Sequence, residues 1–469
     1  MVLRYVADGT HSDVPAGIYE HFIKFIIVES STGENLFNTL VKEIEMLELD
    51  VENIRGQGYD NRANMKGHNS GVLARLLERN SRAFYTPCVC HNYNLVLGDM
   101  AKTCSDAMTF FGTLQRIYTL FASSTKRWTV FKKHVKGLSV KPLSETRWEC
   151  RMESVKAVRF QAAEVCDALE ELAKSTNDAQ GKSEAESLVN QMTNYRFLVA
   201  LCFWHSLLFQ VNFTSKELQS NTIDIAAGLT SFKKLFDYQE TGFVAALIDA
   251  KELANELEVE PIFQQKRCYK KKKMFLYESS DEPILEPKTE FRVNFFNQVV
   301  DKALQSLQPR FMQLKEHHKL FGFLYNFQNM SKEDLRKHSA DLEIALTDIT
   351  KDIEGFMLSK EMEAIKPKLP VQPKELFKYL ACNGRSTAFP NLFIALKIQM
   401  TIPVTVASGE RSFSKLKLIK TYLRSVINQE RLNNLALISI ESPISREIIY
   451  EKILKDFASK KARKIHFDL

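Results

Sequence analysis

Residues 54–77, IRGQGYDNRANMKGHNSGVLARLL, place a carboxylate where a strand gives way to a helix. The glycine-containing stretch ends on Asp60, and the residues from Met65 to Leu77 have the apolar spacing of a helix. Asp60 has two interpretations. It is an N-cap that accepts hydrogen bonds from the first free amides of the helix, or a metal ligand at the end of a sheet, where α/β folds build their sites. The residues alone favour the cap.

The sequence on either side of this stretch predicts an α/β plan. MVLRYVADG (1–9) and YEHFIKFIIVES (19–30) are rich in β-branched and aromatic residues, and Asp8-Gly9 has turn chemistry, so residues 1–30 predict a hairpin. Residues 35–49 have helical spacing. FYTPCVCH (84–91) predicts a further strand, followed by one long helix to about residue 122. Strands that alternate with helices are typical of an α/β domain.

Residues 150–385 change in character. Heptad-like apolar spacing, as in VCDALEELAK (165–174), predicts a helical block with almost no strand signal. Residues 264–290 interrupt it with a basic run, an acidic run and two prolines, which predicts a loop. Beyond it, the sequence up to residue 440 predicts amphipathic helices, two of which are separated by Pro403.

Composition sets wide bounds. A chain of 469 residues allows two or three domains, and 45% hydrophobic with 26% charged residues is ordinary for a globular protein. The net charge of +7 permits a nucleic-acid partner without requiring one. The sequence contains no secretory h-region and no apolar run of membrane-spanning length. We therefore expect the eight cysteines to be free thiols in an intracellular protein that has no membrane partner and is nuclear or cytosolic.

Four short motifs carry the chemistry, and each is weak alone. They are GQGYDNRANM (56–65), CVCHNYNL (88–95), SETRWE (144–149) and ASGERSFS (407–414). The C-x-x-H spacing of Cys88 and His91 offers two zinc ligands where a site needs about four, so a structural role is favoured. Trp148 alone is more often a packing residue, and Glu410 on a helix is more often solvated or locally paired.

Together, these motifs resemble the hAT superfamily of DNA transposases. The nearer resemblance is to transposase-derived proteins of the zinc finger MYM-type-like and hAT-dimerisation-domain kinds. PCVCHNYNLVL (87–97), ETRWE (145–149) and the long segment 403–440 carry it, and it is strongest over 50–160 and 387–441. It implies a ribonuclease-H-like α/β core interrupted by a large all-α insertion, with dimerisation helices at the C-terminus.

The resemblance also implies site residues. Family members cut DNA with three acidic residues that hold two divalent ions, because paired Mg²⁺ ions stabilise the attacking and leaving oxygens of phosphoryl transfer. Asp60 falls on the second acidic position and Glu410 on the third, so the resemblance favours Asp60 as a metal ligand that also caps its helix. Trp148, next to Arg147, falls on the tryptophan that stacks on a flipped base. Cys88, His91 and Asn94 fall on a structural segment of the family.

One element of the family pattern is missing. The first catalytic aspartate belongs on a strand before the hairpin that begins at Met1, and the nearby Asp8 and Asp13 fit the hairpin turn better. We therefore expect a core truncated at its N-terminus, without its first strand, and a degenerate site that does not cleave DNA. No cofactor is expected, apart from Mg²⁺ at Asp60 and Glu410 if an upstream segment supplies the aspartate and with it the ancestral activity.

The predicted domains are the N-terminal part of the core (1–150), the helical insertion (151–385), the C-terminal part of the core with the dimerisation region (386–445) and a basic tail (446–469). The predicted function is protein dimerisation, with its own copies or with related hAT-domain proteins, together with DNA binding in the nucleus.

Two surfaces carry these partner predictions. The first is an apolar stripe at Leu416, Ile419, Leu423, Val426, Leu432, Leu435 and Ile438. It pairs with another chain or packs within the monomer, and the sequence leaves both interpretations open. The second is a basic cluster at Lys266, Arg267, Lys270, Lys271, Lys272 and Lys273. It binds DNA or acts as a nuclear-import signal, or it is simply a solvated loop.

Overall fold

In the computed structural model the chain divides into two compact units, which are described separately. Unit 1 comprises Met1–Cys88 and Leu320–Leu469, and unit 2 comprises Val89–Lys319. The structure describes residues 1–10, 14–59, 63–67, 70–144, 148–218, 225–265, 286–365, 372–382, 384–403, 405–421, 424 and 426–459. Unit 1 is therefore assembled from the two ends of the sequence. The predicted boundaries at residues 150, 385 and 445 do not coincide with this division.

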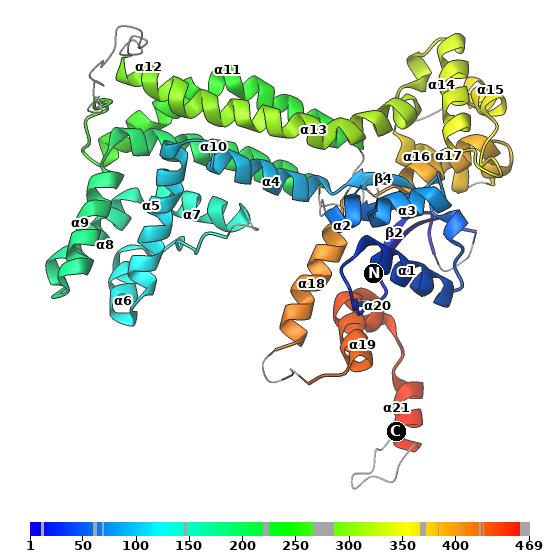
Figure 1. Cartoon of the computed structure of the whole chain (residues 1–469), viewed down its shortest axis with the longest axis horizontal. Helices are drawn as coiled ribbons and strands as arrows, with labels where there is room; N and C mark the ends of the chain where they lie inside the picture. Colours follow the sequence, from blue (N-terminus) through cyan, green and yellow to red (C-terminus); the bar gives the residue numbers. More distant parts are fainter. Residues whose placement is uncertain are drawn as a thin grey trace. The chain divides into compact units, whose positions relative to one another are not determined.

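Unit 1 contains two small sheets (Figure 1). β1 (Val2–Ala7) and β2 (Gly17–Phe22) form an antiparallel hairpin, and β3 (Gly56–Tyr59) and β4 (Phe84–Pro87) run parallel. The hairpin confirms the prediction for the N-terminal residues. The described strands form two separate two-stranded sheets, so the single ribonuclease-H-like sheet that the resemblance implies stays a prediction.

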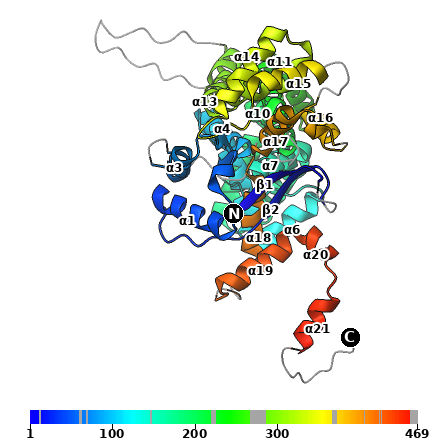
Figure 2. The same ribbon diagram turned by 90° about the vertical axis from the view of Figure 1, so that its right-hand side faces the viewer.

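The helices of unit 1 come from both ends of the chain. They are α1 (Gly33–Met46), α2 (Ala63–Lys66), α3 (Val72–Arg79), α14 (Lys332–Ala345), α15 (Gly355–Ile365), α16 (Pro373–Ala381), α17 (Pro390–Thr401), α18 (Ala407–Ile419), α19 (Gln429–Ile440), α20 (Ser442–Glu447) and α21 (Glu451–Ser459). Within this unit, Figures 1 and 2 show the strands between α14–α17 on one side and α18–α21 on the other. Pro403 lies between α17 and α18, as predicted.

Side-chain alternation explains how the hairpin joins these helices. Inward-facing residues of a strand recur at every second position, so Val6 and Phe22 lie on one face of the hairpin, and because they lie at different ends of it they point into two different hydrophobic clusters. Val6 packs with apolar residues between Phe321 and Ile402, which include those of α14–α17. Phe22 packs with α18 and α19. A third cluster joins α1, α3 and the short helix Val51–Asn53.

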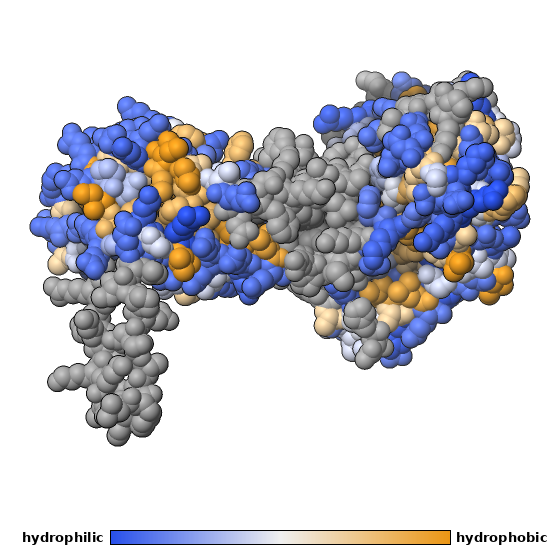
Figure 3. All heavy atoms as spheres, turned by 90° about the horizontal axis from the view of Figure 1, so that it is seen from above, coloured by the Kyte–Doolittle hydropathy of each residue, from blue (hydrophilic) through white to orange (hydrophobic). Residues whose placement is uncertain are grey.

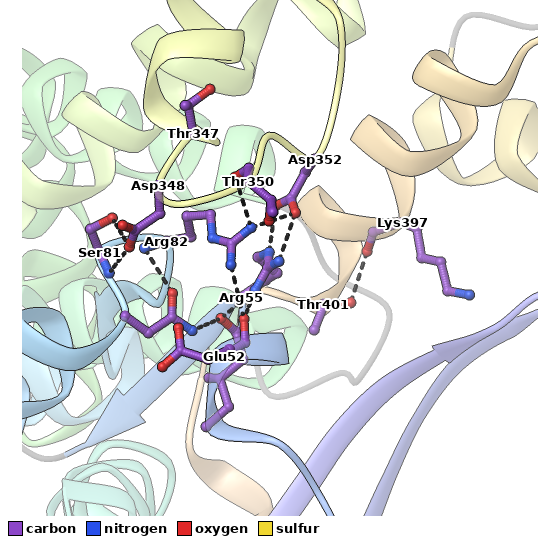
Figure 4. Close-up of polar contacts among 12 residues, drawn as sticks. Glu52, Arg55, Ser81, Arg82, Thr347, Asp348, Thr350, Asp352, Lys397 and Thr401 are labelled. Carbon is purple, nitrogen blue, oxygen red and sulfur yellow. Dashed lines mark hydrogen bonds and ion pairs between the residues drawn. The ribbon is translucent and has the colours of Figure 1, made fainter.

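A buried ion-pair network ties the early and late segments of unit 1 together (Figure 4). Asp352, in the loop between α14 and α15, accepts hydrogen bonds from Arg55 at 2.5 and 2.7 Å and from Arg82 at 2.8 Å. The side chain of Arg82 is only 6% exposed. In the same loop, Asp348 accepts a hydrogen bond from the Ser81 hydroxyl at 2.8 Å. Because buried charges are tolerated only when they are paired, this network fixes the loop against the β3–β4 region.

Unit 2 is helical in all its described secondary structure. Its helices are α4 (Val89–Ala101), α5 (Ser105–Ala122), α6 (Thr125–His134), α7 (Trp148–Phe160), α8 (Ala162–Ser175), α9 (Ala179–Met192), α10 (Tyr195–Leu218), α11 (Ile225–Glu256), α12 (Pro287–Phe291), a π-helical turn (Arg292–Asn297) and α13 (Gln298–Phe321), which ends just inside unit 1. Its core is aromatic, with Phe203, Trp204, Phe295 and Phe296 all fully buried.

Three sequence predictions need comment. The long helix expected up to residue 122 is wrong, because it is two helices that break at residues 102–104, where Lys102 and Thr103 donate to turn-forming carbonyls of Asp99 and Met100. The strand expected over 84–91 ends at Pro87, and α4 begins at Val89. Most of the predicted loop 264–290 lies outside the described residues. Among those that are described, no helix has the length and apolar character needed to cross a bilayer.

Candidate functional site

Of the two predicted catalytic residues, Glu410 lies in the described part of the chain and Asp60 does not. Asp60 directly follows the last residue of β3 but lies outside the described residues. Glu410 is exposed in the first turn of α18. Since β3 and β4 are parallel, their carboxyl ends lie at the same edge, which is the edge where α/β folds place ligands. Tyr59 stacks on Tyr85 there, with ring centroids 6.3 Å apart, and burial raises the pKa of Tyr59.

The segment that leads into α18 is held against this edge. A Cβ atom on Gly56 would lie 2.9 Å from Cδ of Pro403, and one on Gly58 would lie 3.1 Å from Cγ1 of Val406. The hydroxyl of Thr86, on β4, donates to the carbonyl of Pro403, 317 residues later. Only glycine permits the side chains of Pro403 and Val406 to approach the β3 backbone so closely. The glycines before Asp60 therefore seat the start of the helix that carries Glu410.

Cys88 contributes to the same junction. Its side chain is buried, and its Sγ atom accepts a hydrogen bond from the backbone N–H of Val406 at 3.5 Å and lies 3.9 Å from the hydroxyl of Thr405. These contacts suit the predicted structural role of Cys88. His91 and Asn94 lie on α4 in unit 2, and their structural role stays a prediction. No group of three or more metal-binding side chains occurs among the described residues.

The carboxylate of Glu20 contacts α18, and an arginine neutralises its charge. Glu20 of β2 accepts a hydrogen bond from the Ser408 hydroxyl in the first turn of α18. Its other oxygen lies 2.6 Å from the guanidinium of Arg4, and its side chain is only 5% exposed. Arg4 also donates to the carbonyl of Met400 at 3.1 Å. Glu20 therefore fastens α18 to the hairpin, and its charge is already paired.

Trp148 lies at the start of α7 and is only 4% exposed. The guanidinium carbon of Arg151 lies 4.3 Å from the centre of its ring, and Phe111 packs edge-on at 5.8 Å. A base could stack on this ring only after Arg151 moved away. Arg147 lies outside the described residues, as do the basic-cluster residues Lys266, Arg267, Lys270, Lys271, Lys272 and Lys273.

The predicted dimerisation stripe divides into an inner and an outer set. Ile419 and Leu432 are buried against Phe22 and Phe25 of the hairpin region, and the partly buried Leu416 and Leu435 pack on the same cluster. Val426 is 96% exposed and Ile438 58% exposed. Leu423 lies outside the described residues. Most of the described stripe thus packs within unit 1, as one of the two interpretations expected.

Sequence reasoning missed a larger exposed apolar set near the C-terminus. It comprises Phe413, Leu418, Leu437, Ile444, Ile448, Ile449, Ile453, Leu454 and Phe457, each at least 42% exposed. The face of the molecule drawn in Figure 3 has a mainly hydrophilic coloured surface with separate apolar groups. The sequence signal for this set is a high concentration of apolar residues, because IIYEKILKDF (448–457) contains six of them within ten residues. Such concentrations of exposed apolar residues mark interaction sites.

A cavity in unit 2 offers no comparable site. It has a volume of about 370 Å³ and is lined by His134, Asp167, Glu170, Glu171, Lys174 and Ser175. Glu171 is already engaged by Lys133 at 2.7 Å and by His134 at 2.6 Å. These hydrogen bonds lower the pKa of Glu171, that from Lys133 most strongly. The charge of Glu171 at this cavity is therefore already neutralised by its ion pairs.

Comparison with known proteins gives these regions a family context. Residues 357–444 match the hAT family C-terminal dimerisation region, and residues 1–71 match the ZMYM1/FAM200 RNase-like domain. The chain is 23% identical to the human protein named 52 kDa repressor of the inhibitor of the protein kinase, over 98% of this chain and 62% of the relative. It is also 23% identical to the mouse protein of the same name, over 96% of this chain and 60% of that relative. The chain thus spans about three fifths of the length of these relatives.

Both matches fall on unit 1. The RNase-like match covers the hairpin, α1 and β3, and the dimerisation match runs from α15 to α20. The second match supports self-association. The chain is therefore similar to the ZMYM1/FAM200 RNase-like domain over residues 1–71 and to the hAT family C-terminal dimerisation region over residues 357–444, and the predicted resemblance to transposase-derived proteins of the hAT superfamily is confirmed.

Proposed function

We propose that this chain is a transposase-derived protein that acts by associating with a second copy of itself, or with a related hAT-domain protein, and does not cleave DNA. The observation that carries the proposal is the exposed apolar surface on the helices of the dimerisation region. We name this the C-terminal apolar surface and define it as Phe413, Leu418, Leu437, Ile438 and Ile444. These residues are between 42% and 69% exposed.

The two faces of α19 support this surface as an interface. Leu432, Leu435 and Ala436 pack against the hairpin cluster. Leu437 and Ile438 lie on other faces of the helix, where they are 42% and 58% exposed. An amphipathic helix normally buries one apolar stripe and presents polar residues elsewhere. A second chain that covered Leu437 and Ile438 would remove apolar area from water, worth roughly 25 cal/mol per Å².

The acidic residues nearest the hairpin support a non-cleaving core. Asp8 accepts hydrogen bonds from the hydroxyl and the backbone N–H of Thr10 at 2.6 and 3.2 Å, which makes it a turn residue. These two bonds, chiefly that from the hydroxyl, lower the pKa of Asp8 to about 2. Glu20 is paired with Arg4. Neither carboxylate is arranged as a free ligand beside Glu410, and a two-metal mechanism needs ligands that hold both ions.

The test of association is the mass of the full chain as its concentration rises. Sedimentation equilibrium is expected to show a dimer for the wild-type chain and a monomer for Ile438→Asp. Asn434→Asp adds the same charge at an exposed position of α19 and is expected to remain dimeric. A wild-type chain that stays monomeric at every concentration would overturn the proposal.

The test of the non-cleaving part is plasmid nicking in Mg²⁺. We expect no difference between the wild-type chain and the variants Asp60→Asn and Glu410→Gln. Nicking by the wild-type chain that both variants abolish would establish the alternative function, a Mg²⁺-dependent transposase or nuclease.

DNA binding in the nucleus is a secondary proposal, supported by the net charge of +7 and by the basic cluster at 266–273. Binding of this kind is electrostatic, so its affinity is expected to fall steeply with added salt and with substitution of Lys270–Lys273 by glutamine. A salt-independent affinity would exclude it.

A further inference from the structure

α21 (Glu451–Ser459) follows the region that matches the hAT dimerisation family, which ends at residue 444. In Figures 1 and 2 it extends away from α19 and α20 within unit 1. None of its residues is buried against the described part of the chain. Tyr450 Oη donates to the carbonyl of Ser445 at 2.5 Å, which connects the start of α21 to α20.

The apolar residues of α21 lie on one side of the helix. Ile453 and Phe457 are four residues apart and therefore occupy the same helical face, with Leu454 beside them; they are 53%, 50% and 42% exposed. Ile449, which lies two residues before the helix begins, is 79% exposed. A helix of nine residues is marginal in water unless an apolar face is covered. We therefore expect the apolar face of α21 to be covered by a surface outside the described part of unit 1.

The charges of α21 indicate which kind of surface covers it. The helix carries Glu451, Lys452, Lys455 and Asp456, two charges of each sign. A helix that binds an anionic membrane or nucleic acid is normally basic on its polar face. Within residues 451–459 the polar face is therefore neutral, and the basic residues of the tail, Lys460, Lys461, Arg463 and Lys464, follow the helix in the sequence. A neutral polar face beside an exposed apolar face fits a protein surface that is itself apolar.

The C-terminal apolar surface of a second copy meets this description, and α21 continues directly from it. Three residues separate α20 from α21. In a two-fold dimer, each copy contributes the same contacts, so an arm that crosses to the partner is matched by an arm that crosses back. Both arms then add apolar area to one interface.

We propose that α21 is a dimerisation arm, which packs Ile449, Ile453 and Leu454 onto the C-terminal apolar surface of a second copy of this chain. This inference rests on the proposed function, because it assumes that the chain forms a homodimer. It extends the interface beyond the family's dimerisation region and names the residues that make the extension.

The experiment compares dimer dissociation constants of full-length chains by sedimentation equilibrium. Ile453→Asp and Leu454→Asp are each expected to weaken the dimer at least tenfold. Lys455→Gln, which makes the same change in net charge on the polar side, is expected to stay within twofold. Circular dichroism of all three variants should stay close to that of the wild-type chain, because the substituted residues are exposed and α21 contributes only nine residues to the helical signal. A dissociation constant that is unchanged in both Ile453→Asp and Leu454→Asp would overturn the proposal that α21 is a dimerisation arm.

Two further results separate the arm from the proposed function. If Ile438→Asp dissociates the dimer while Ile453→Asp does not, the proposed function stands and the arm is wrong. If the wild-type chain binds anionic vesicles and Ile453→Asp abolishes that binding without changing the dimer, the covering surface is a membrane and the arm is again wrong. Hydrogen exchange provides a second readout, because amides 452–459 are expected to gain protection as the protein concentration rises through the dissociation constant.

Discussion

Asp352 and Arg55, separated by 297 residues, form a two-point ion pair in which Nε meets Oδ2 at 2.5 Å and Nη2 meets Oδ1 at 2.7 Å. Arg55 lies within the RNase-like match, and Asp352 lies just before the dimerisation match. Both side chains are nearly buried, at 12% and 13% exposed. The RNase-like match is thus joined by a specific contact to the loop that precedes the dimerisation match, and we expect these segments of unit 1 to fold together.

Asp352→Asn should therefore destabilise unit 1 strongly. It leaves the guanidinium groups of Arg55 and Arg82 without their shared carboxylate, and removal of one partner from a buried pair costs about 3 kcal/mol or more. Urea unfolding should show a lower midpoint with an unchanged slope. Asp348→Asn, in the same loop but at an exposed contact with Ser81, is the matched control and should have a much smaller effect. Equal effects of the two variants would contradict a special role for the Asp352 pair.

Leu432 and Leu437 should respond differently to truncation, although both are leucines on α19. Leu432 is 5% exposed in the cluster with Phe22 and Phe25, and Leu437 is 42% exposed. Leu432→Ala removes buried methyl groups and leaves a cavity, which costs about 2–5 kcal/mol. Leu437→Ala should cost less than about 1 kcal/mol of monomer stability and act mainly on the dimer. Urea unfolding of each variant at a concentration below the dimer dissociation constant checks this, and a larger loss for Leu437→Ala would reverse the assignment.

The difference between Leu432 and Leu437 on α19 shows what sequence periodicity can and cannot predict. Periodicity located the amphipathic helices around Pro403 and the alternation of the N-terminal hairpin, because both signals are local. It could not decide which apolar face is covered, because Phe22 and Phe25 lie some 400 residues away from Leu432 in sequence. The exposed face of α19 was therefore not separated from the buried stripe, and α21 lay outside the predicted stripe.

The unit boundaries and the candidate site also depend on contacts between residues that are distant in the sequence, which local patterns do not predict. The sequence grouped α4–α6 with the N-terminal strands, yet α4 and α5 pack against α9 and α10 in unit 2. The glycines at 56 and 58 were visible, but the contact of their backbone with Pro403 and Val406 needed the fold. Trp148 was identified from its motif, whereas its burial under Arg151 depends on how α5 and α7 pack.

Stability should fall in acid because of His317 on α13. Burial lowers the pKa of His317 to about 3, with a smaller contribution from the adjacent His318. The unfolded chain takes up a proton on this residue near its ordinary pKa of about 6.5, while the folded chain does not. The stabilisation is therefore complete above about pH 6.5 and declines as the pH falls toward 3, by up to about 1.4 kcal/mol per pH unit. Urea unfolding at pH 7 and pH 5 should show this loss for the wild-type chain and less of it for His317→Gln, which has no ionisable group. An identical pH dependence in both proteins would exclude His317 as its source.

Gly56→Ala should loosen the junction between β3 and α18. The added Cβ atom would lie 2.9 Å from Cδ of Pro403 and 3.0 Å from Cα of Ile402, so the segment before α18 must shift. Overpacking of this kind costs about 1–3 kcal/mol. Gly409→Ala is the control in the same unit, because it lies in α18 with no atom within 4 Å of its Cβ position, and alanine there should stabilise the helix by up to about 1 kcal/mol. Urea unfolding should therefore move in opposite directions for the two variants. Stabilisation by Gly56→Ala would mean that the contact with Pro403 does not hold α18 against β3.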